Sequence, residues 1–276
     1  MIRFANVNDA EELGKIHYES VIRTYQGIYT EDYFKHMSLK SYIASWRKYL
    51  GKGNYRTIVS VNDNECIQGF AAVGLFVRRK IGWLDYFHVK ADEQHKGIGS
   101  QLISAACGLL AFEGIESMEL LYAEGNDNAR RFYDKYGAKY IGSYYRIENG
   151  ELHFNNKLRI DKLSSFASEN PLSLGFDAEY KKLLSYVKDD FIIWGVGNYY
   201  NYWVEQFGET VKPKIFFDSN EDINGLYANG VQVVLPHKTD IPIIIACSQY
   251  DEIEEKVKEL GCTNYVGFYP WHDYSL

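Results

Sequence analysis

The sequence predicts an α/β protein built from two domains. Its 276 residues exceed the roughly 100–200 residues of one compact domain. Charge is divided unevenly, because residues 1–163 carry a net charge of +2 and the remainder −9. Apolar runs typical of strands also alternate with stretches of helical periodicity. We therefore predict domains at residues 1–162 and 177–276, joined by a linker at 163–176 that is rich in small and polar residues.

Bulk composition excludes several classes of function. No apolar run approaches the ~20 residues that span a bilayer, and the N-terminus lacks a signal-peptide apolar region, so we expect a cytoplasmic protein with no membrane partner. The acidic second half would repel phosphate backbones, which argues against nucleic acid. The four cysteines show no paired spacing, which predicts free thiols and no metal site: Cys66, Cys107, Cys247 and Cys262.

The chain opens with a strand and two helices. A strand is predicted at 2–5. Asn8, with Glu11 three residues later, resembles the cap of a first helix. A second helix should begin at Thr30, because acidic residues in its first turn favour the helix dipole.

A series of strands and two helices follows, which predicts a mixed central sheet flanked by helices. The final two strands are joined by Asn149-Gly150, a strong signal for a hairpin. The expected strands are 56–62, 66–77, 82–89, 118–123, 139–147 and 152–160, and the expected helices are 97–112 and 126–136.

The second half alternates strands and helices, which predicts a small Rossmann-like parallel α/β domain. The last helix should have Ser248 as its N-cap, with Asp251 three residues on, and should stop before Gly261. The expected strands are 191–194, 214–217 and 241–246.

A polar turn with two glycines lies between an apolar strand and an amphipathic helix. The strand ends at Val89, and the turn reads Gln94-His95-Lys96-Gly97-Ile98-Gly99. Backbone N–H groups at a helix N-terminus attract anions, and glycine lets the backbone come close to them. The turn therefore predicts a pyrophosphate site.

Two stretches at matching spacing resemble the GNAT (GCN5-related) N-acetyltransferase family. Residues 89–103 resemble its strand-loop-helix, with the pattern Gln/Arg-x-x-Gly-x-Gly/Ala, and residues 126–138 resemble its N-x-x-A-x-x-F-Y-x-x-x-G-F helix. Ala138 replaces the final aromatic of that pattern. A softer match lies at Tyr25-Gln26-Gly27-Ile28-Tyr29, so the resemblance covers about residues 1–162.

This resemblance implies acetyl-CoA as cosubstrate and no metal. Amides of the turn would hold the pyrophosphate, and the exposed backbone of the strand before it would pair with the pantetheine arm. An amide near Val89 would polarise the thioester carbonyl. His95 and Lys96 would face solvent, with Lys96 adding charge near the phosphates. The cosubstrate-binding residues so implied are Phe87, His88, Val89, Gln94, His95, Lys96, Gly97, Ile98, Gly99, Ser100 and Asn126.

Three side chains are candidates for proton transfer. By the resemblance, Tyr133 would protonate the departing thiolate; otherwise it is a core aromatic. Asp85 is an acid within an apolar strand, which costs free energy unless a partner or a function accounts for it. It would orient the amine or accept its proton, or else pair with a nearby Lys or Arg. His88 is a rival base, or ordinary strand packing.

Strand alternation predicts which of these residues share a face. Trp83, Asp85, Phe87 and Val89 should lie on one face of the sheet. Leu84, Tyr86 and His88 should lie on the other face.

The acceptor is expected to be a small-molecule amine, attacked directly in a ternary complex. Aromatic residues in the first two helices, with an acid nearby, would suit an amino sugar, an aminoglycoside or a polyamine. The alternative function is a sensor or adaptor that binds CoA or a nucleotide. A homodimer is one arrangement expected of the chain. The aromatic residues are Tyr18, Tyr25, Tyr29, Tyr33 and Trp46.

A second glycine pair lies in the C-terminal half. Gly195-Val196-Gly197 resembles the first turn of a dinucleotide fold, but Tyr200 replaces the third glycine. Asp218 stands where an acid would reach a ribose hydroxyl. This half also resembles small nucleotide- or sugar-nucleotide-binding domains, so we expect a binding or interaction module there. A degenerate scaffold, or a reductase active site at this turn, is the alternative.

Overall fold

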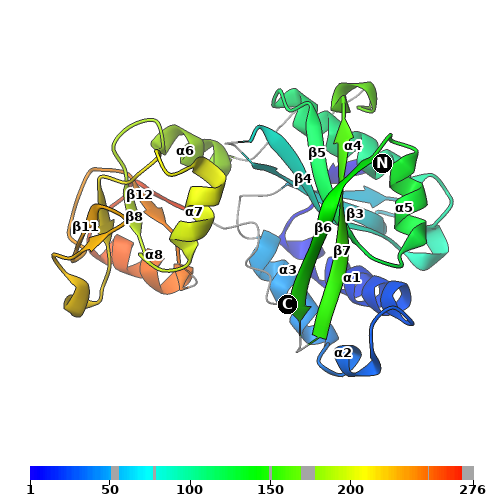
Figure 1. Ribbon diagram of the computed structural model, residues 1–276, viewed down its shortest axis with the longest axis horizontal. Helices are drawn as coiled ribbons and strands as arrows, with labels where there is room; N and C mark the ends of the chain where they lie inside the picture. The colour runs from blue at the N-terminus through cyan, green and yellow to red at the C-terminus, as the bar shows by residue number, and fades with distance from the viewer. Residues whose placement is uncertain (51–55, 77–78, 149–150, 169–177, 248, 269–276) are drawn as a thin grey trace.

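The computed structural model describes residues 1–50, 56–76, 79–148, 151–168, 178–247 and 249–268 (Figure 1). Two sheets organise them. The first has the order β1-β2-β3-β4-β5-β7-β6. Its strands are β1 (Ile2–Phe4), β2 (Arg56–Val61), β3 (Ile67–Phe76), β4 (Ile81–Val89), β5 (Ser117–Ala123), β6 (Lys139–Glu148) and β7 (Glu151–Asp161).

Helices cover both faces of the first sheet. On one face, Leu13 and Trp46 pack against Phe70. On the other, Leu102 and Leu109 lie in a larger buried cluster. The first face carries α1 (Ala10–Tyr25) and α3 (Leu39–Leu50), with the short α2 (Glu31–Lys35) between them, and the second carries α4 (Ile98–Phe112) and α5 (Asp127–Asp134) (Figure 1).

The N-terminal cap lies two residues earlier than the sequence predicted. The predicted pair of Asn8 and Glu11 is wrong, because residues 7–9 form a 3-10 turn ahead of α1. Asn6 caps that turn by accepting from the Asn8 N–H, and the Asp9 carboxylate accepts from the Asn6 N–H (2.8 Å). Arg3 fixes the same carboxylate through an ion pair at 2.8 Å.

Thr30 caps a helix as predicted, but that helix is short. The Thr30 hydroxyl accepts from the Tyr33 N–H, and α2 ends at Lys35 before α3 begins. The predicted hairpin is present, since β6 and β7 pair antiparallel; its turn residues 149–150 lie outside the described residues. Leu163, the first residue of the predicted linker, is fully buried and belongs to the core.

The second sheet has the order β10-β11-β9-β8-β12-β13 and is mixed. Its other pairings are parallel, but Tyr227–Ala228 turns back antiparallel onto β11. The prediction of a wholly parallel sheet is therefore wrong at this edge. The strands are β8 (Ile192–Trp194), β9 (Ile215–Phe217), β10 (Tyr227–Ala228), β11 (Val231–Val234), β12 (Ile243–Ile245) and β13 (Tyr265–Gly267).

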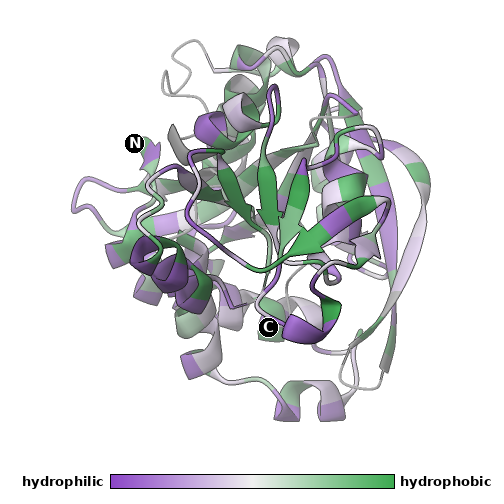
Figure 2. Ribbon diagram, turned by 90° about the vertical axis from the view of Figure 1, so that its left-hand side faces the viewer, coloured by the Kyte–Doolittle hydropathy of each residue, from purple (hydrophilic) through white to green (hydrophobic). Residues whose placement is uncertain are grey.

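Alternating side chains of this sheet reach helices on its two faces. Ile193 lies in the cluster that contains Trp203 of α7 (Tyr199–Phe207) and residues of α6 (Ala178–Tyr186). Ile192 packs in a separate cluster with Val257 of α8 (Tyr250–Glu259). Figure 2 shows apolar strands enclosed by helices with hydrophilic outer surfaces. The predicted cap Ser248 lies outside the described residues.

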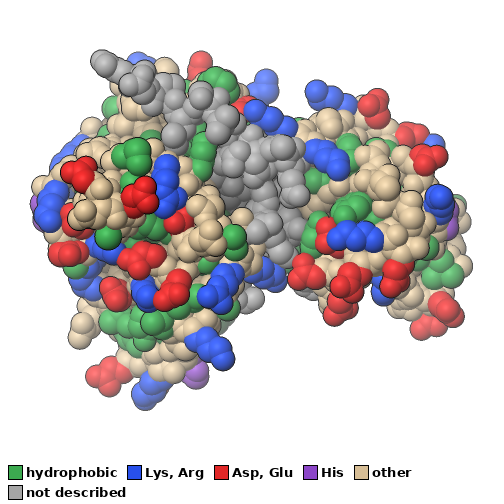
Figure 3. All heavy atoms as spheres, turned by 180° about the vertical axis from the view of Figure 1, so that it is seen from behind, with side chains coloured by type: hydrophobic (Ala, Val, Ile, Leu, Met, Phe, Trp, Pro, Cys, Tyr) green, Lys and Arg blue, Asp and Glu red, His purple; other side chains and the backbone are tan. Residues whose placement is uncertain are grey.

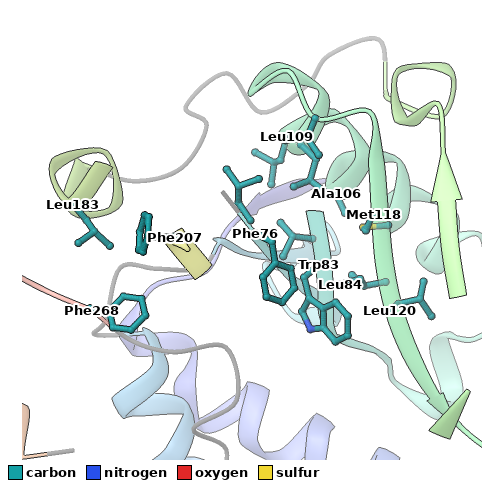
Figure 4. Close-up of a cluster of buried hydrophobic side chains, with 14 of the residues drawn as sticks. Phe76, Trp83, Leu84, Ala106, Leu109, Met118, Leu120, Leu183, Phe207 and Phe268 are labelled. Carbon is teal, nitrogen blue, oxygen red and sulfur yellow. The ribbon is translucent and has the colours of Figure 1, made fainter. Parts of the chain in front are cut away.

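The elements that carry the two sheets touch one another. Gln206 of α7 donates from Nε2 to the Leu75 carbonyl (2.5 Å). Figure 4 shows Leu183, Phe207 and Phe268 continuing the buried cluster that includes Phe76. Acidic side chains gather along the lower rim of the second unit in Figure 3. Within the described residues, no helix is long and apolar enough to cross a membrane.

Candidate active site

The two central strands of the first sheet pair only over their first halves. The parallel ladder between β4 and β5 ends at the pair of Leu84 and Leu120. Beyond it, β5 continues to pair with β7 as far as Ala123 and Asn155. Residues 85–89 of β4 therefore keep a backbone edge that β5 does not use. An extended ligand can pair with such an edge.

A β-bulge at Asp85 changes the predicted faces of β4. Ala72 pairs with Tyr86 and Val73 pairs with Leu84, which leaves Asp85 as the additional residue. Gly82 faces α4, because a Cβ there would lie 2.4 Å from a methyl carbon of Leu110.

The bulge places Phe87 on the same face as Leu84 and separates Leu84 from Tyr86, which packs on the opposite face. Leu84 shares the face of Gly82, and beyond the bulge Phe87 also faces α4, 3.7 Å from a Cβ built at Gly99. The predicted grouping of Trp83 with Phe87 is therefore wrong, since the additional residue reverses the alternation.

Asp85 lies beside a charged network that the sequence did not indicate. The Trp83 Nε1–H donates to Asp85 Oδ1 (3.4 Å), and Lys157 Nζ lies 5.5 Å from the Trp83 ring centroid. Lys157 also pairs with Glu119 (2.6 Å), which contacts Arg79 as well. Burial tends to raise the pKa of Glu119, but Lys157 and Arg79 outweigh it and lower that pKa, so this buried acid stays ionised.

The predicted pyrophosphate turn presents a run of unused N–H groups. Within the described residues, the backbone N–H groups of residues 95–100 make no hydrogen bond, and α4 has no side-chain cap. Gly97 begins the helix with φ +86°, and Ser100 is exposed. Six successive donors at one helix N-terminus make an anion-binding arrangement.

The side chains of this turn take no part in the run of free N–H groups. His95 and Lys96 are exposed, and Lys96 pairs with Glu93 (3.3 Å). Gln94 donates from Nε2 to the Val89 carbonyl (3.4 Å), which ties the turn to the end of β4. Arg23 of α1 reaches the same carbonyl (3.4 Å). A positive charge therefore lies at the free edge of β4.

Tyr133 is buried near this edge. It lies 6.2 Å from Phe87 between ring centroids, and Phe132 fills the space beside both rings. Burial is the larger cause and the nearby Tyr25 the smaller cause of a raised pKa of the Tyr133 hydroxyl. The hydroxyl therefore stays protonated. Asn126 is the N-cap of the same helix, and its Oδ1 accepts from the Ala129 N–H (3.1 Å).

His88 points to the opposite face from Phe87. Its Nδ1 is 3.0 Å from the Ser20 hydroxyl, and its ring lies 4.7 Å from that of His17. Burial, and next the charge of Arg23, lowers the pKa of His88 to about 4. A neutral and weakly basic imidazole fits packing against α1 better than proton transfer at neutral pH.

The lowered pKa of His88 predicts a loss of stability in acid. An imidazole with an unfolded pKa near 6.5 binds protons more readily in the unfolded chain, so stability falls as pH drops from about 6.5 toward 4. Between pH 7.5 and 5.5 this group should cost ~1 kcal/mol. Urea unfolding at both pH values should show a smaller difference for His88→Asn. An unchanged difference would contradict this assignment.

An unpaired strand edge thus lies beside six free N–H groups and a buried, protonated phenol, an arrangement that can bind an extended anionic ligand. Among the described residues, no group of three His, Cys, Asp or Glu side chains could hold a metal ion. The described cysteines are free.

Part of this chain is similar to known proteins. The Acetyltransferase (GNAT) family matches residues 18–138. The uncharacterized N-acetyltransferase YuaI of Bacillus subtilis (strain 168) is 24% identical over 143 residues, 51% of this chain and 80% of the relative. Residues 18–138 are thus similar to GNAT acetyltransferases, and the protein is an acyltransferase enzyme.

Solved structures that are similar to part of this chain include two complexes. PaiA N-acetyltransferase from Thermoplasma acidophilum, with coenzyme A, is 21% identical, with a TM-score of 0.44 over 58% of this chain and 98% of its own. Phosphinothricin acetyltransferase from Sinorhizobium meliloti, with acetyl-CoA, is 18% identical, with a TM-score of 0.45 over 63% and 89%.

Proposed function

We propose that the protein transfers an acetyl group from acetyl-CoA to a primary amine of a small molecule, by direct attack in a ternary complex. The observation that carries the proposal is the run of six unused N–H groups at residues 95–100, next to the free edge of β4. The pyrophosphate would bind to the N–H groups, and the pantetheine amides would pair with the free edge of β4. Acetyl-CoA supplies an activated thioester.

The chain's own residues would divide the remaining work. The backbone of residues 87–89 would hold the pantetheine arm, and Asn126 would contact it. Tyr133 would donate its proton to the departing thiolate, since its raised pKa keeps the hydroxyl protonated at neutral pH. Asp85 would orient the amine from the bulge at the point where β4 and β5 separate. The charge of the ionised Glu119 nearby is compensated by its ion pairs with Lys157 and Arg79.

Calorimetry with acetyl-CoA tests the cradle, and α4 provides matched variants. Gly97 and Gly114 flank its two ends, both with positive φ and with nothing near a built Cβ. Replacing either with Ala should cost ~1 kcal/mol of stability, from the left-handed backbone. Only Gly97→Ala should also weaken acetyl-CoA binding, by about tenfold, because it reorients the N–H groups.

Two calorimetric outcomes would count against the proposal. The first is the absence of acetyl-CoA binding by the intact chain. The second is an equal loss of affinity in Gly97→Ala and Gly114→Ala, which would indicate a general effect of destabilising α4.

The second sheet is proposed to be a separate module of residues 177–276, linked at 163–176 to an acetyltransferase domain of residues 1–162. A nucleotide or sugar nucleotide at Gly195–Gly197 and Asp218, a homodimer and a cytoplasmic location remain predictions. A sensor or adaptor role for the whole chain would be favoured by binding of both CoA and a nucleotide without acetylation of any amine.

A further inference from the structure

Two buried polar side chains on β7 have unmet hydrogen-bonding groups. His153 is 3% exposed and Asn155 is 7% exposed. Within the described part of the chain, neither His153 Nε2 nor Asn155 Nδ2 has a hydrogen-bond partner. A buried polar atom without a partner costs free energy, so such atoms commonly have a role that the protein alone does not show.

Both side chains lie on the same face of β7 as Lys157, because alternate residues of a strand share a face. Lys157 approaches Trp83, whose indole N–H reaches Asp85. Asn155 pairs with Ala123, in the part of β5 that has separated from β4. Lys157, Asn155 and His153 therefore form a row along β7. The row begins near Asp85 and runs beside the part of β5 that has separated from β4.

Aromatic rings from the connection between α1 and α2, and from α2, pack against His153. The ring centroid of Tyr29 lies 4.1 Å from that of His153, and the centroid of Tyr33 lies 5.1 Å from it. Tyr29 follows Gly27, which has φ +85°, in the short connection between α1 and α2. A ligand group would reach His153 and Asn155 when the Tyr29 ring turns aside.

We infer that His153 and Asn155 recognise a hydroxyl or carbonyl oxygen of the acceptor, so that the substrate is an oxygen-bearing amine, such as an amino sugar, rather than a polyamine. This inference rests on the proposed acetyltransferase function. An amide nitrogen only donates hydrogen bonds, and therefore needs an acceptor atom on its partner. Protonated polyamines present only N–H donors and methylenes, which leave Asn155 Nδ2 unsatisfied. A sugar hydroxyl accepts a hydrogen bond from Nδ2 and bonds to the His153 imidazole. The aromatic rings then cover the apolar face of the sugar.

A thiol-release assay with acetyl-CoA and a panel of amines tests the substrate class. Glucosamine and kanamycin present hydroxyl oxygens, and putrescine and spermidine present none. We expect kcat/KM for at least one oxygen-bearing amine to exceed that for both polyamines by tenfold or more. Preference for a polyamine, or no turnover of an oxygen-bearing amine by protein that binds acetyl-CoA, would overturn the inference.

Variants of β7 test the residues themselves. Asn155→Leu and His153→Phe keep the bulk of the side chain and remove the unmet polar atom. Each should raise KM for the preferred amine about tenfold and leave acetyl-CoA affinity unchanged. Their melting temperatures should stay level or rise, because the unmet group is gone. A merely structural role would instead lower the melting temperature and leave KM unchanged.

Asn156 provides a matched control. It neighbours Asn155 but lies on the opposite face of β7, where it accepts from the Ser143 hydroxyl (3.4 Å). Asn156→Leu should leave KM unchanged, and a rise equal to that of Asn155→Leu would refute the assignment. Absence of acetyl-CoA binding by the wild-type chain would instead count against the proposed function, so the two failures are distinguishable.

Discussion

Replacing Tyr133 with Phe should lower kcat about 100-fold while leaving the dissociation constant for acetyl-CoA almost unchanged. The substitution removes a single hydroxyl from a ring that is 6% exposed and packs beside Phe87. Binding of the cosubstrate depends on backbone groups of the turn and of β4, which this change does not alter. Loss of the proton donor should therefore affect turnover alone. Single-turnover kinetics and calorimetry measure the two quantities separately.

The matched control is Tyr136→Phe, one turn farther along. Tyr136 packs between Phe132 and Phe166, and the same hydroxyl deletion there should leave kcat within about twofold. The raised pKa of Tyr133 adds a pH criterion, because its proton should not be lost below about pH 10. Equal turnover by Tyr133→Phe and wild type would show that another group, or water, protonates the thiolate.

Local sequence signals predicted the backbone elements around the proposed cosubstrate site. The spacing of Val89, Gly97 and Asn126 specifies a strand end, a left-handed helix start and a helix cap, and each is a local feature of the backbone. Such features depend on a few neighbouring residues, so one sequence is enough to predict them.

The acceptor side depends on contacts that are distant in the chain. The bulge at Asp85 adds one residue to a strand without changing its composition, so strict alternation placed Trp83 on the wrong face. The sequence around Glu119 gives no sign of its ion pairs, because Lys157 and Arg79 are both distant from it in the chain. His153 becomes buried only when Tyr29 and Tyr33, more than 100 residues earlier in the chain, pack against it. No local pattern reports such burial.

Replacing Gly195 with Ala should destabilise the second unit by ~3 kcal/mol or more, whereas Gly197→Ala should change stability by less than ~1 kcal/mol. Gly195 has φ +119°, and a Cβ there would lie 2.5 Å from the Ala246 carbonyl oxygen. Its N–H also donates to Phe217, so the backbone cannot move away without breaking the connection between β8 and β9. Nothing lies within 4 Å of a Cβ at Gly197. Urea unfolding, followed by intrinsic tryptophan fluorescence to which the buried Trp194 and Trp203 contribute, measures both variants.

The contrast between these two glycines bears on whether the second unit binds a nucleotide. Close packing of β8 against the end of β12 already accounts for Gly195, so its presence favours a scaffold as much as a phosphate cradle. Only Gly197 offers the open space that a phosphate would need at the start of α7. A nucleotide whose affinity falls in Gly197→Ala, at unchanged stability, would establish a second ligand. An equal loss of stability in both variants would instead contradict the packing explanation for Gly195.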